Sequence, residues 1–170
     1  MEAKKSSESK TVMTELVLPN DTNNLGNLHG GKVLYWMDIC SALAAGKHTR
    51  HVSVTAAVDN VSFKNPIKQG HVITITAQVT RTFNTSLEVH ISVWAENILS
   101  GDKYQSNEAF YTFVALDKTG KPVQTPDVIP ETEYEKKLYD GALRRRQLRL
   151  ILGGRMKPEH AEELKALFTD

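Results

Sequence analysis

An aspartate inside an apolar run is the residue of this sequence best placed to do chemistry. Asp38 lies between Met37 and Ile39, and no lysine or arginine stands three or four positions away. Burying an ionised carboxylate without a partner costs several kcal/mol, so Asp38 should face a polar cavity or an interface. There it could act as a general base that activates water, or as a nucleophile toward a carbonyl carbon. The alternative is a solvated acid on an exposed helix stripe.

Two polar features precede Asp38. Asn23 lies in a polar loop, where its side-chain amide can donate a hydrogen bond to a carbonyl oxygen or orient a water molecule. An asparagine in such a loop is otherwise ordinary turn chemistry. Gly30 and Gly31 directly precede the apolar run. If a helix begins there, their N–H groups and the helix dipole favour an oxyanion, whereas the alternative is a tight turn that needs glycine.

A buried helix and a surrounding sheet must position these residues. The run from Val33 to Ala45 is apolar almost all round, which predicts a central helix, and Gly46 is a plausible stop. Thr11 to Leu18 predicts a short strand, and nearly all of residues 51–116 has strand patterns, most clearly the alternation from Ser86 to Glu96. Connections such as residues 97–102 are too short for a parallel crossover, so the sheet should be antiparallel.

The chain length of 170 residues fits one domain. We expect a frayed tail over residues 1–10, the main domain over 11–130 and a helical extension over 131–170, with a charged helix from about Glu131 to Leu152 and a last helix starting near Pro158. The tail has no apolar core, so it does not resemble a signal peptide.

Composition limits the classes of partner. The net charge of +1 gives no global attraction to nucleic acid, and no apolar run approaches the ~20 residues that span a bilayer. The single cysteine, Cys40, excludes an internal disulfide and favours a reducing compartment, so we expect a cytoplasmic protein. The run Arg144–Arg146 with Arg149 is typical of a solvated helix face. His48 and His51 lack further ligands at metal-site spacing, which favours surface or loop histidines and no metal site.

The motif around these residues resembles a known family. Residues 23–31 followed by Asp38 resemble the signature of hotdog-fold acyl-CoA thioesterases of the cytosolic acyl-CoA hydrolase group. That pattern is Asn, two residues, Gly, two residues, His-Gly-Gly, then Asp nine residues after the His. Four further segments are similar to the family in order, and the similarity runs from about Lys10 to Tyr139. These segments contain Thr55, Phe63 with Pro66 and Ile67, residues 113–117 and residues 128–132.

The resemblance implies an α+β hotdog fold, in which an antiparallel sheet of five to six strands wraps around one long central helix, with C-terminal helices added. It implies hydrolysis of fatty acyl-CoA to free fatty acid and CoA, with water as co-substrate and no metal or redox cofactor. Asp38 would be general base or nucleophile, and Asn23 from the partner subunit would polarise the thioester or orient water. Thr55 would hydrogen-bond Asp38 or the water, although a strand threonine is often merely β-favoured. The minimal active unit would be a homodimer, assembled into a trimer of dimers.

The segment 81–86 is where the sequence departs from the family. Relatives commonly have a glycine and a basic residue before the Thr-Ser pair of this segment, which lies near bound CoA. Arg81, Thr82, Asn84 and Ser86 are the candidate CoA contacts, and a polar hairpin turn is the alternative. His29 is expected to be a structural part of the turn.

Two other functions remain on the same fold. A dehydratase or hydratase would need a His-Asp pair presented differently, which the sequence lacks. A non-catalytic acyl-CoA sensor is the second alternative, but such regulators usually carry a DNA-binding domain, which residues 1–10 cannot hold.

Overall fold

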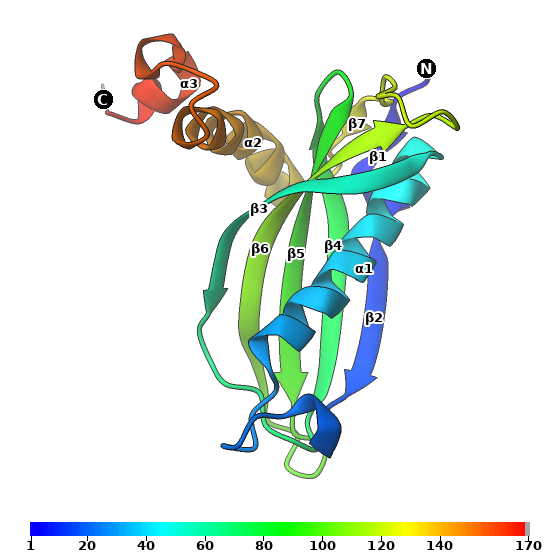
Figure 1. Ribbon diagram of the computed structural model, residues 1–170, viewed down its shortest axis with the longest axis vertical. Helices are drawn as coiled ribbons and strands as arrows, with labels where there is room; N and C mark the ends of the chain where they lie inside the picture. The colour runs from blue at the N-terminus through cyan, green and yellow to red at the C-terminus, as the bar shows by residue number, and fades with distance from the viewer. Residues whose placement is uncertain (169–170) are drawn as a thin grey trace.

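Five antiparallel strands wrap around one long helix in the computed structural model, which describes residues 1–168 (Figure 1). The helix is α1, Gly30–Thr49, and the sheet has the order β2-β4-β5-β6-β3. This arrangement confirms the predicted antiparallel sheet around a central helix. The strands of the sheet are β2 Thr11–Leu16, β3 Val52–Phe63, β4 Val72–Thr82, β5 Ser86–Glu96 and β6 Lys103–Leu116. The remaining elements are β1 Lys4–Lys5, β7 Val128–Ile129, α2 Glu133–Leu152 and α3 Glu162–Lys165, with short 3-10 turns at Ser6–Ser9, Pro19–Asp21, Pro158–His160 and Ala166–Phe168.

The core lies between α1 and the concave face of the sheet. The apolar positions of β4 and β5 are fully buried at every second residue, as the alternation predicts, and they pack against Met37, Cys40 and Ala44 of α1. Burial raises the pKa of the Cys40 thiol to about 11, so this side chain stays protonated and acts as a small apolar group.

Helix α1 extends beyond the predicted stop at Gly46. It continues to Thr49, and Arg50 ends it in the left-handed conformation with φ 58°, donating its N–H to the carbonyl of Gly46 at 2.8 Å. His48 lies in this extra turn and is fully buried, so the expectation of a surface or loop histidine was wrong for it. Its Nε2 lies 2.9 Å from the carbonyl oxygen of Pro126. Burial lowers the pKa of His48 below its usual value, which keeps the ring neutral.

The N-terminal segment is ordered, in contrast to the predicted frayed tail. Lys4–Lys5 pairs in parallel with Val128–Ile129. The following 3-10 turn buries two serines, and their hydroxyls bond both backbone groups of Val79: Ser6 Oγ donates to its carbonyl at 2.6 Å, and Ser9 Oγ accepts its N–H at 2.8 Å. Strand β2 pairs with β4 only as far as Ala77, so these serines satisfy edge groups of β4 that would otherwise lack a partner.

Helix α2 lies across the outer face of the sheet, and its arginines are not the predicted solvated face. Arg145 makes two hydrogen bonds to the carboxylate of Glu88, at 2.7 and 3.0 Å, and lies over the ring of Phe110. Glu88 is 1% exposed and also accepts the hydroxyl of Thr80 at 2.6 Å. Arg149 pairs with Asp59 of β3 at 2.6 Å. Sequence periodicity could not reveal these contacts, because the acidic partners lie on strands distant along the chain.

The buried Glu88–Arg145 pair predicts a large effect on stability. Replacing Arg145 by methionine leaves an uncompensated carboxylate at a site that is 1% exposed, and breaking such a pair typically costs about 3–5 kcal/mol. We expect the urea midpoint to fall accordingly in equilibrium unfolding. The double change Glu88→Gln with Arg145→Met should recover most of the loss, and Lys136→Met, which removes an exposed ion pair with Glu133, should change nothing measurable. A stable Arg145→Met single variant would show that the pair does not anchor α2.

The C-terminal part after α2 projects away from the sheet on the side of β3 (Figure 1). The predicted last helix from Pro158 is instead a 3-10 turn, the short α3 and a second 3-10 turn that ends at Phe168. The last two positions of the predicted 131–170 extension lie outside the described residues. The division of the chain at residue 130 stays a prediction. None of the helices within residues 1–168 is long and apolar enough to cross a bilayer.

Candidate active site

Asp38 and Thr55 meet where the middle of α1 faces the first half of β3. Thr55 Oγ1 donates a hydrogen bond to Asp38 Oδ1 at 2.6 Å, which confirms the predicted contact between them. Asp38 is half-buried and Thr55 is exposed, so the carboxylate is held by one hydroxyl and remains accessible. A carboxylate fixed in this way has a free oxygen for a water molecule.

Tyr111 of β6 lies beneath this pair. It is almost fully buried, and its hydroxyl donates to the carbonyl oxygen of Leu34 at 3.4 Å. Burial first, and the negative charge of Asp38 second, raise the pKa of Tyr111 to about 12, so its hydroxyl stays protonated beside the carboxylate. No sequence pattern distinguished Tyr111 from its neighbours, because β6 is apolar on both faces around it.

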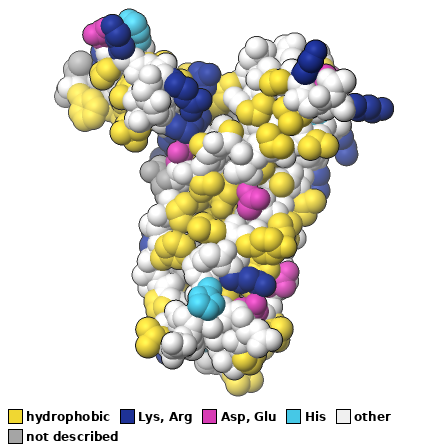
Figure 2. All heavy atoms as spheres, in the orientation of Figure 1, with side chains coloured by type: hydrophobic (Ala, Val, Ile, Leu, Met, Phe, Trp, Pro, Cys, Tyr) yellow, Lys and Arg dark blue, Asp and Glu magenta, His cyan; other side chains and the backbone are white. Residues whose placement is uncertain are grey.

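The surface around Asp38 is apolar rather than a charged stripe. Figure 2 shows hydrophobic side chains spread over the middle of the face that carries α1, with few charged groups among them. Exposed apolar residues of α1 and β3 contribute to this surface of the molecule, namely Tyr35, Leu43, Val52, Val54 and Val58. A half-buried acid in such surroundings fits a substrate or subunit interface better than a solvated helix stripe.

Asn23 is oriented by the backbone of its own loop. Its Oδ1 accepts the N–H groups of Leu25 at 2.9 Å and Asn27 at 3.2 Å, and Gly26 closes the turn with φ 70°. Because the side-chain oxygen is occupied, only the two Nδ2 hydrogens remain for another molecule. Turn chemistry and a role as hydrogen-bond donor are therefore compatible, since the turn sets the direction of the donor.

Gly30 and Gly31 are the first two residues of α1, and neither has a positive φ, so a strained turn does not explain them. A Cβ on Gly30 would lie 3.2 Å from the ring of Phe63, so Gly30 permits this close contact. A Cβ on Gly31 would meet nothing within 4 Å. Their N–H groups belong to the first helical turn, which has no preceding carbonyls to accept them. The helix start thus offers donors, and the space beside Gly31 is open. His29 is the exposed N-cap residue and makes no side-chain capping bond.

A cavity of about 270 Å³ lies beside Asn23. Its lining includes Phe63 and Asn107, two residues from the ends of strands that border the helix start. Asn107 is fully buried, and its Nδ2 donates to the carbonyl of Ser62 at 3.1 Å, which fixes the end of β3 and therefore Phe63. Nothing in the sequence distinguished Asn107 from the other polar residues at the start of its strand.

The candidate residues form two separate groups in one chain. Asn23 lies beside the start of α1, whereas Asp38 lies eight residues after Gly30, about 12 Å further along the helix axis. Within residues 1–168 no hydrogen bond joins the two side chains.

The predicted CoA contacts lie at the turn between β4 and β5. Arg81 does not extend from this turn, because its guanidinium packs 4.2 Å from the Tyr139 ring and donates to the Tyr139 carbonyl at 3.2 Å. Asn84 is exposed, and Thr82 and Ser86 are half-buried. Among residues 1–168 no three His, Cys, Asp or Glu side chains gather closely enough to hold a metal ion.

Known proteins are similar to this chain in sequence and in fold. The family model described as the thioesterase superfamily matches residues 25–101. An uncharacterized acyl-CoA thioester hydrolase of Bacillus subtilis, YkhA, is 39% identical over 164 residues, which are 96% of this chain and 92% of that protein. The cytosolic acyl coenzyme A thioester hydrolase of Rattus norvegicus is 36% identical over 156 residues, or 90% of this chain and 41% of that protein.

Two solved structures extend the likeness. A hexameric acyl-CoA thioesterase in its apo form has TM-score 0.88 and 41% identity, covering 90% of this chain and 98% of that one. An acyl-CoA hydrolase of Staphylococcus aureus, solved with butyryl coenzyme A, has TM-score 0.83 and 35% identity, and the match covers 90% of this chain and 95% of that chain. Three variants of that enzyme were also solved, and in each of them one residue, an Asn, an Asp or a Thr, is replaced by Ala. The Asp follows the Asn by 15 residues and the Thr follows the Asp by 17, which are also the intervals between Asn23, Asp38 and Thr55 in this chain. This chain belongs to the acyl-CoA thioester hydrolases of the thioesterase superfamily and has their hotdog fold.

Proposed function

We propose that this enzyme hydrolyses a fatty acyl-CoA to a free fatty acid and CoA at a site shared between two subunits. We call Asp38 with Thr55 one half-site and Asn23 with the start of α1 the other, and the observation that carries the proposal is where these two groups lie along β3. Thr55, which holds Asp38, lies in the first half of this strand, and Phe63, which packs on Gly30 beside Asn23, is its last residue.

Strand β3 has a free edge for a second copy of the chain. Within the described residues it pairs with β6 alone, although it is 12 residues long and carries the exposed Val52, Val54 and Val58. A long apolar edge of this kind favours pairing with another strand. Antiparallel pairing of two β3 strands about their centres sets Thr55 of one subunit opposite position 60 of the other, three residues before the partner's Phe63. Asp38 of one subunit then faces Asn23 of the other, which is the dimer that we propose as the minimal active unit.

The chemistry proposed for this shared site is attack of water on the thioester carbonyl. As general base, Asp38 takes a proton while the water oxygen bonds to the carbonyl carbon. The carbonyl oxygen becomes an oxyanion, which accepts hydrogen bonds from Asn23 Nδ2 and from the N–H groups of Gly30 and Gly31. The C–S bond then breaks, and the proton on Asp38 passes to the departing CoA thiolate. As nucleophile, Asp38 would instead attack the carbonyl carbon and expel the CoA thiolate as the C–S bond breaks, and water would hydrolyse the resulting anhydride to the fatty acid and the Asp38 carboxylate. No metal or redox cofactor is needed in either route.

We further propose that CoA lies along the β4–β5 turn, with Thr82, Asn84 and Ser86 near its phosphates and Arg81 adding positive charge from its place against Tyr139. The hexameric neighbour supports assembly of the proposed dimers into a trimer of dimers. The cytosolic rat relative supports a cytoplasmic location.

Release of CoA thiol tests the proposed activity. The purified protein with acyl-CoAs from acetyl to palmitoyl and a thiol reagent should release CoA from at least one of them, with formation of the matching free acid. Binding of acyl-CoA without release of thiol at any chain length would support the sensor instead.

A further inference from the structure

We propose that Tyr104 and His71 are positioning residues for the Asn23 amide and that they act through the backbone segment that supports its loop. Neither side chain takes part in the proposed chemistry. The inference rests on the proposed function, because it requires the Asn23 Nδ2 group to stabilise the oxyanion. It adds a path of hydrogen bonds that runs from the sheet to the start of α1.

The loop that carries Asn23 is held by a short backbone ladder. Leu28 donates its N–H to the carbonyl of Ile67 at 2.7 Å, and Gln69 donates its N–H to the carbonyl of Gly26 at 3.0 Å. The residues between these bonds form an antiparallel bridge. The direction of the Asn23 amide is set by two N–H groups of the same loop, so it depends on where this ladder lies.

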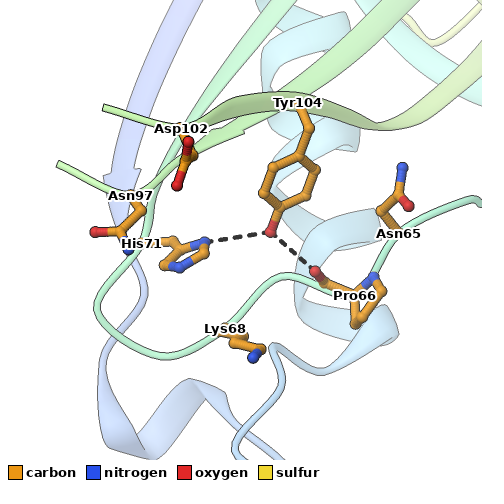
Figure 3. A pocket seen from close by; sticks show the side chains of 7 residues that line it. All are labelled: Asn65, Pro66, Lys68, His71, Asn97, Asp102 and Tyr104. Carbon is orange, nitrogen blue, oxygen red and sulfur yellow. Dashed lines mark hydrogen bonds between the residues drawn. The ribbon is translucent and has the colours of Figure 1, made fainter. Parts of the chain in front are cut away.

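Tyr104 and His71 hold the backbone directly before this ladder. The Tyr104 hydroxyl donates to the carbonyl of Pro66 at 2.9 Å, and His71 Nδ1 lies 3.2 Å from the same hydroxyl oxygen (Figure 3). A hydroxyl has one hydrogen, which the Pro66 carbonyl accepts, so His71 Nδ1 carries the hydrogen of the second bond. The two rings also contact edge to face, with their centroids 6.1 Å apart. The position of Pro66 therefore follows that of the two side chains.

Both side chains are attached to the sheet. Tyr104 is the second residue of β6 and pairs with Ala95 of β5. His71 directly precedes β4, and its carbonyl accepts the N–H of Val17 at 2.9 Å. Burial raises the pKa of the Tyr104 hydroxyl, which therefore keeps its hydrogen at neutral pH. The path thus begins in a rigid part of the fold and ends at the Asn23 loop.

Close packing does not confine the Pro66 segment on every side. Pro66, His71 and Tyr104 all line a cavity of about 450 Å³ (Figure 3). In a packed core the neighbouring side chains would fix the backbone, whereas beside this cavity the hydrogen bond from Tyr104 restrains the Pro66 carbonyl. Loss of the hydroxyl should therefore let the segment shift, and the ladder with it.

Tyr104→Phe removes the hydroxyl and keeps the ring and its contact with His71. We expect kcat to fall about tenfold, because loss of an oxyanion donor costs about 10²–10³-fold and a displaced donor loses part of that effect. KM should stay within about twofold, since the donor acts on the oxyanion rather than on the bound substrate. Steady-state assay of CoA release over a range of acyl-CoA concentrations gives both constants.

The dependence on Asn23 separates positioning from a merely structural role. In the Asn23→Asp background, adding Tyr104→Phe should change kcat by less than about twofold, because the donor that it positions is already absent. In the Asp38→Asn background, the same addition should still lower the residual kcat about tenfold. A loss of stability alone would reduce the folded enzyme in every background.

Variants of His71 and of a distant tyrosine complete the test. His71→Asn keeps an N–H donor near the place of Nδ1, so kcat should stay within about twofold. His71→Leu removes the donor, and kcat should fall about threefold, as for one neutral hydrogen bond. Tyr134→Phe is the matched control. This residue lies on α2 and is 58% exposed, so loss of its hydroxyl should leave kcat unchanged.

The outcomes separate the positioning path from the activity. An equal loss of kcat from Tyr104→Phe in the unchanged and the Asn23→Asp enzymes, or no loss in either, would overturn the path and leave the proposed hydrolysis standing. Absence of thiol release from the unchanged protein would refute the proposed function, and amide hydrogen exchange then tests the path. Exchange of the N–H groups of Leu25, Asn27 and Leu28 should be about tenfold faster in Tyr104→Phe. Equal exchange in the two proteins would contradict the path.

Discussion

Replacing Asp38 by asparagine should lower kcat/KM for thioester hydrolysis by about 10³-fold or more. The change keeps the size of the side chain and an oxygen that accepts the Thr55 hydroxyl, but it removes the group that takes the proton from water. General-base catalysis contributes typically about 10²–10⁴-fold, and loss of a nucleophile has an equal or greater effect. Steady-state assay of CoA release measures the loss, and circular dichroism with thermal unfolding checks that the fold is intact.

The matched control for this variant is Thr55→Val. It keeps the shape of the strand residue and removes only the hydroxyl that holds Asp38, so we expect a loss of about tenfold or more, as for one hydrogen bond to a charged group. A folded Asp38→Asn enzyme with activity near that of the unchanged enzyme would contradict the assigned role. Single turnover in ¹⁸O water separates the two routes, because only the nucleophilic route leaves ¹⁸O on the Asp38 carboxylate.

Replacing Asn23 by aspartate should lower kcat by about 10²–10³-fold, the effect of losing one oxyanion donor. Aspartate retains an oxygen for the N–H groups of Leu25 and Asn27, so the turn is preserved. It lacks the Nδ2 hydrogens and adds a negative charge where the oxyanion forms. Asn23→Ala loses the turn contacts as well, and it should show the same loss of kcat together with lower stability. If Asn23 served the turn alone, Asn23→Asp would remain active while Asn23→Ala lost stability.

The antiparallel sheet and central helix were predictable because apolar periodicity reports burial directly. The alternation in β5 reflects the face of that strand that packs against α1. The apolar run of α1 includes the residues buried on the sheet, although Tyr35 and Leu43 on its other side are exposed. The end of α1 was not predictable, because Gly46 is a common stop and the added turn depends on a contact between His48 and Pro126, far along the chain.

The N-terminal turn and α2 show the same limit on inference from sequence. Ser6 and Ser9 are polar, so their pattern favoured a tail, yet each satisfies a backbone group of Val79 on the edge of β4. Arg145 lies in a charged run, and only the tertiary fold reveals that its partner Glu88 is buried.

For the candidate site, residue types and the family motif singled out Asn23, Asp38 and Thr55, and of the two partners predicted for Thr55 the structure shows Asp38. The orientation of the Asn23 amide by its own loop was not predictable from sequence. Neither were the contributions of Tyr111 and Asn107, which depend on pairing between strands. The catalytic roles of Asn23, Asp38 and Thr55 stay predictions.

Co-expression of Asp38→Asn and Asn23→Asp subunits tests the shared site most directly. Each variant alone should be inactive. Random pairing makes about half of the dimers mixed, and each mixed dimer has one intact site, so the mixture should regain about a quarter of the sites of the unchanged enzyme. If both groups acted within one chain, no pairing could restore a site, and a mixture as inactive as its two components would contradict the account.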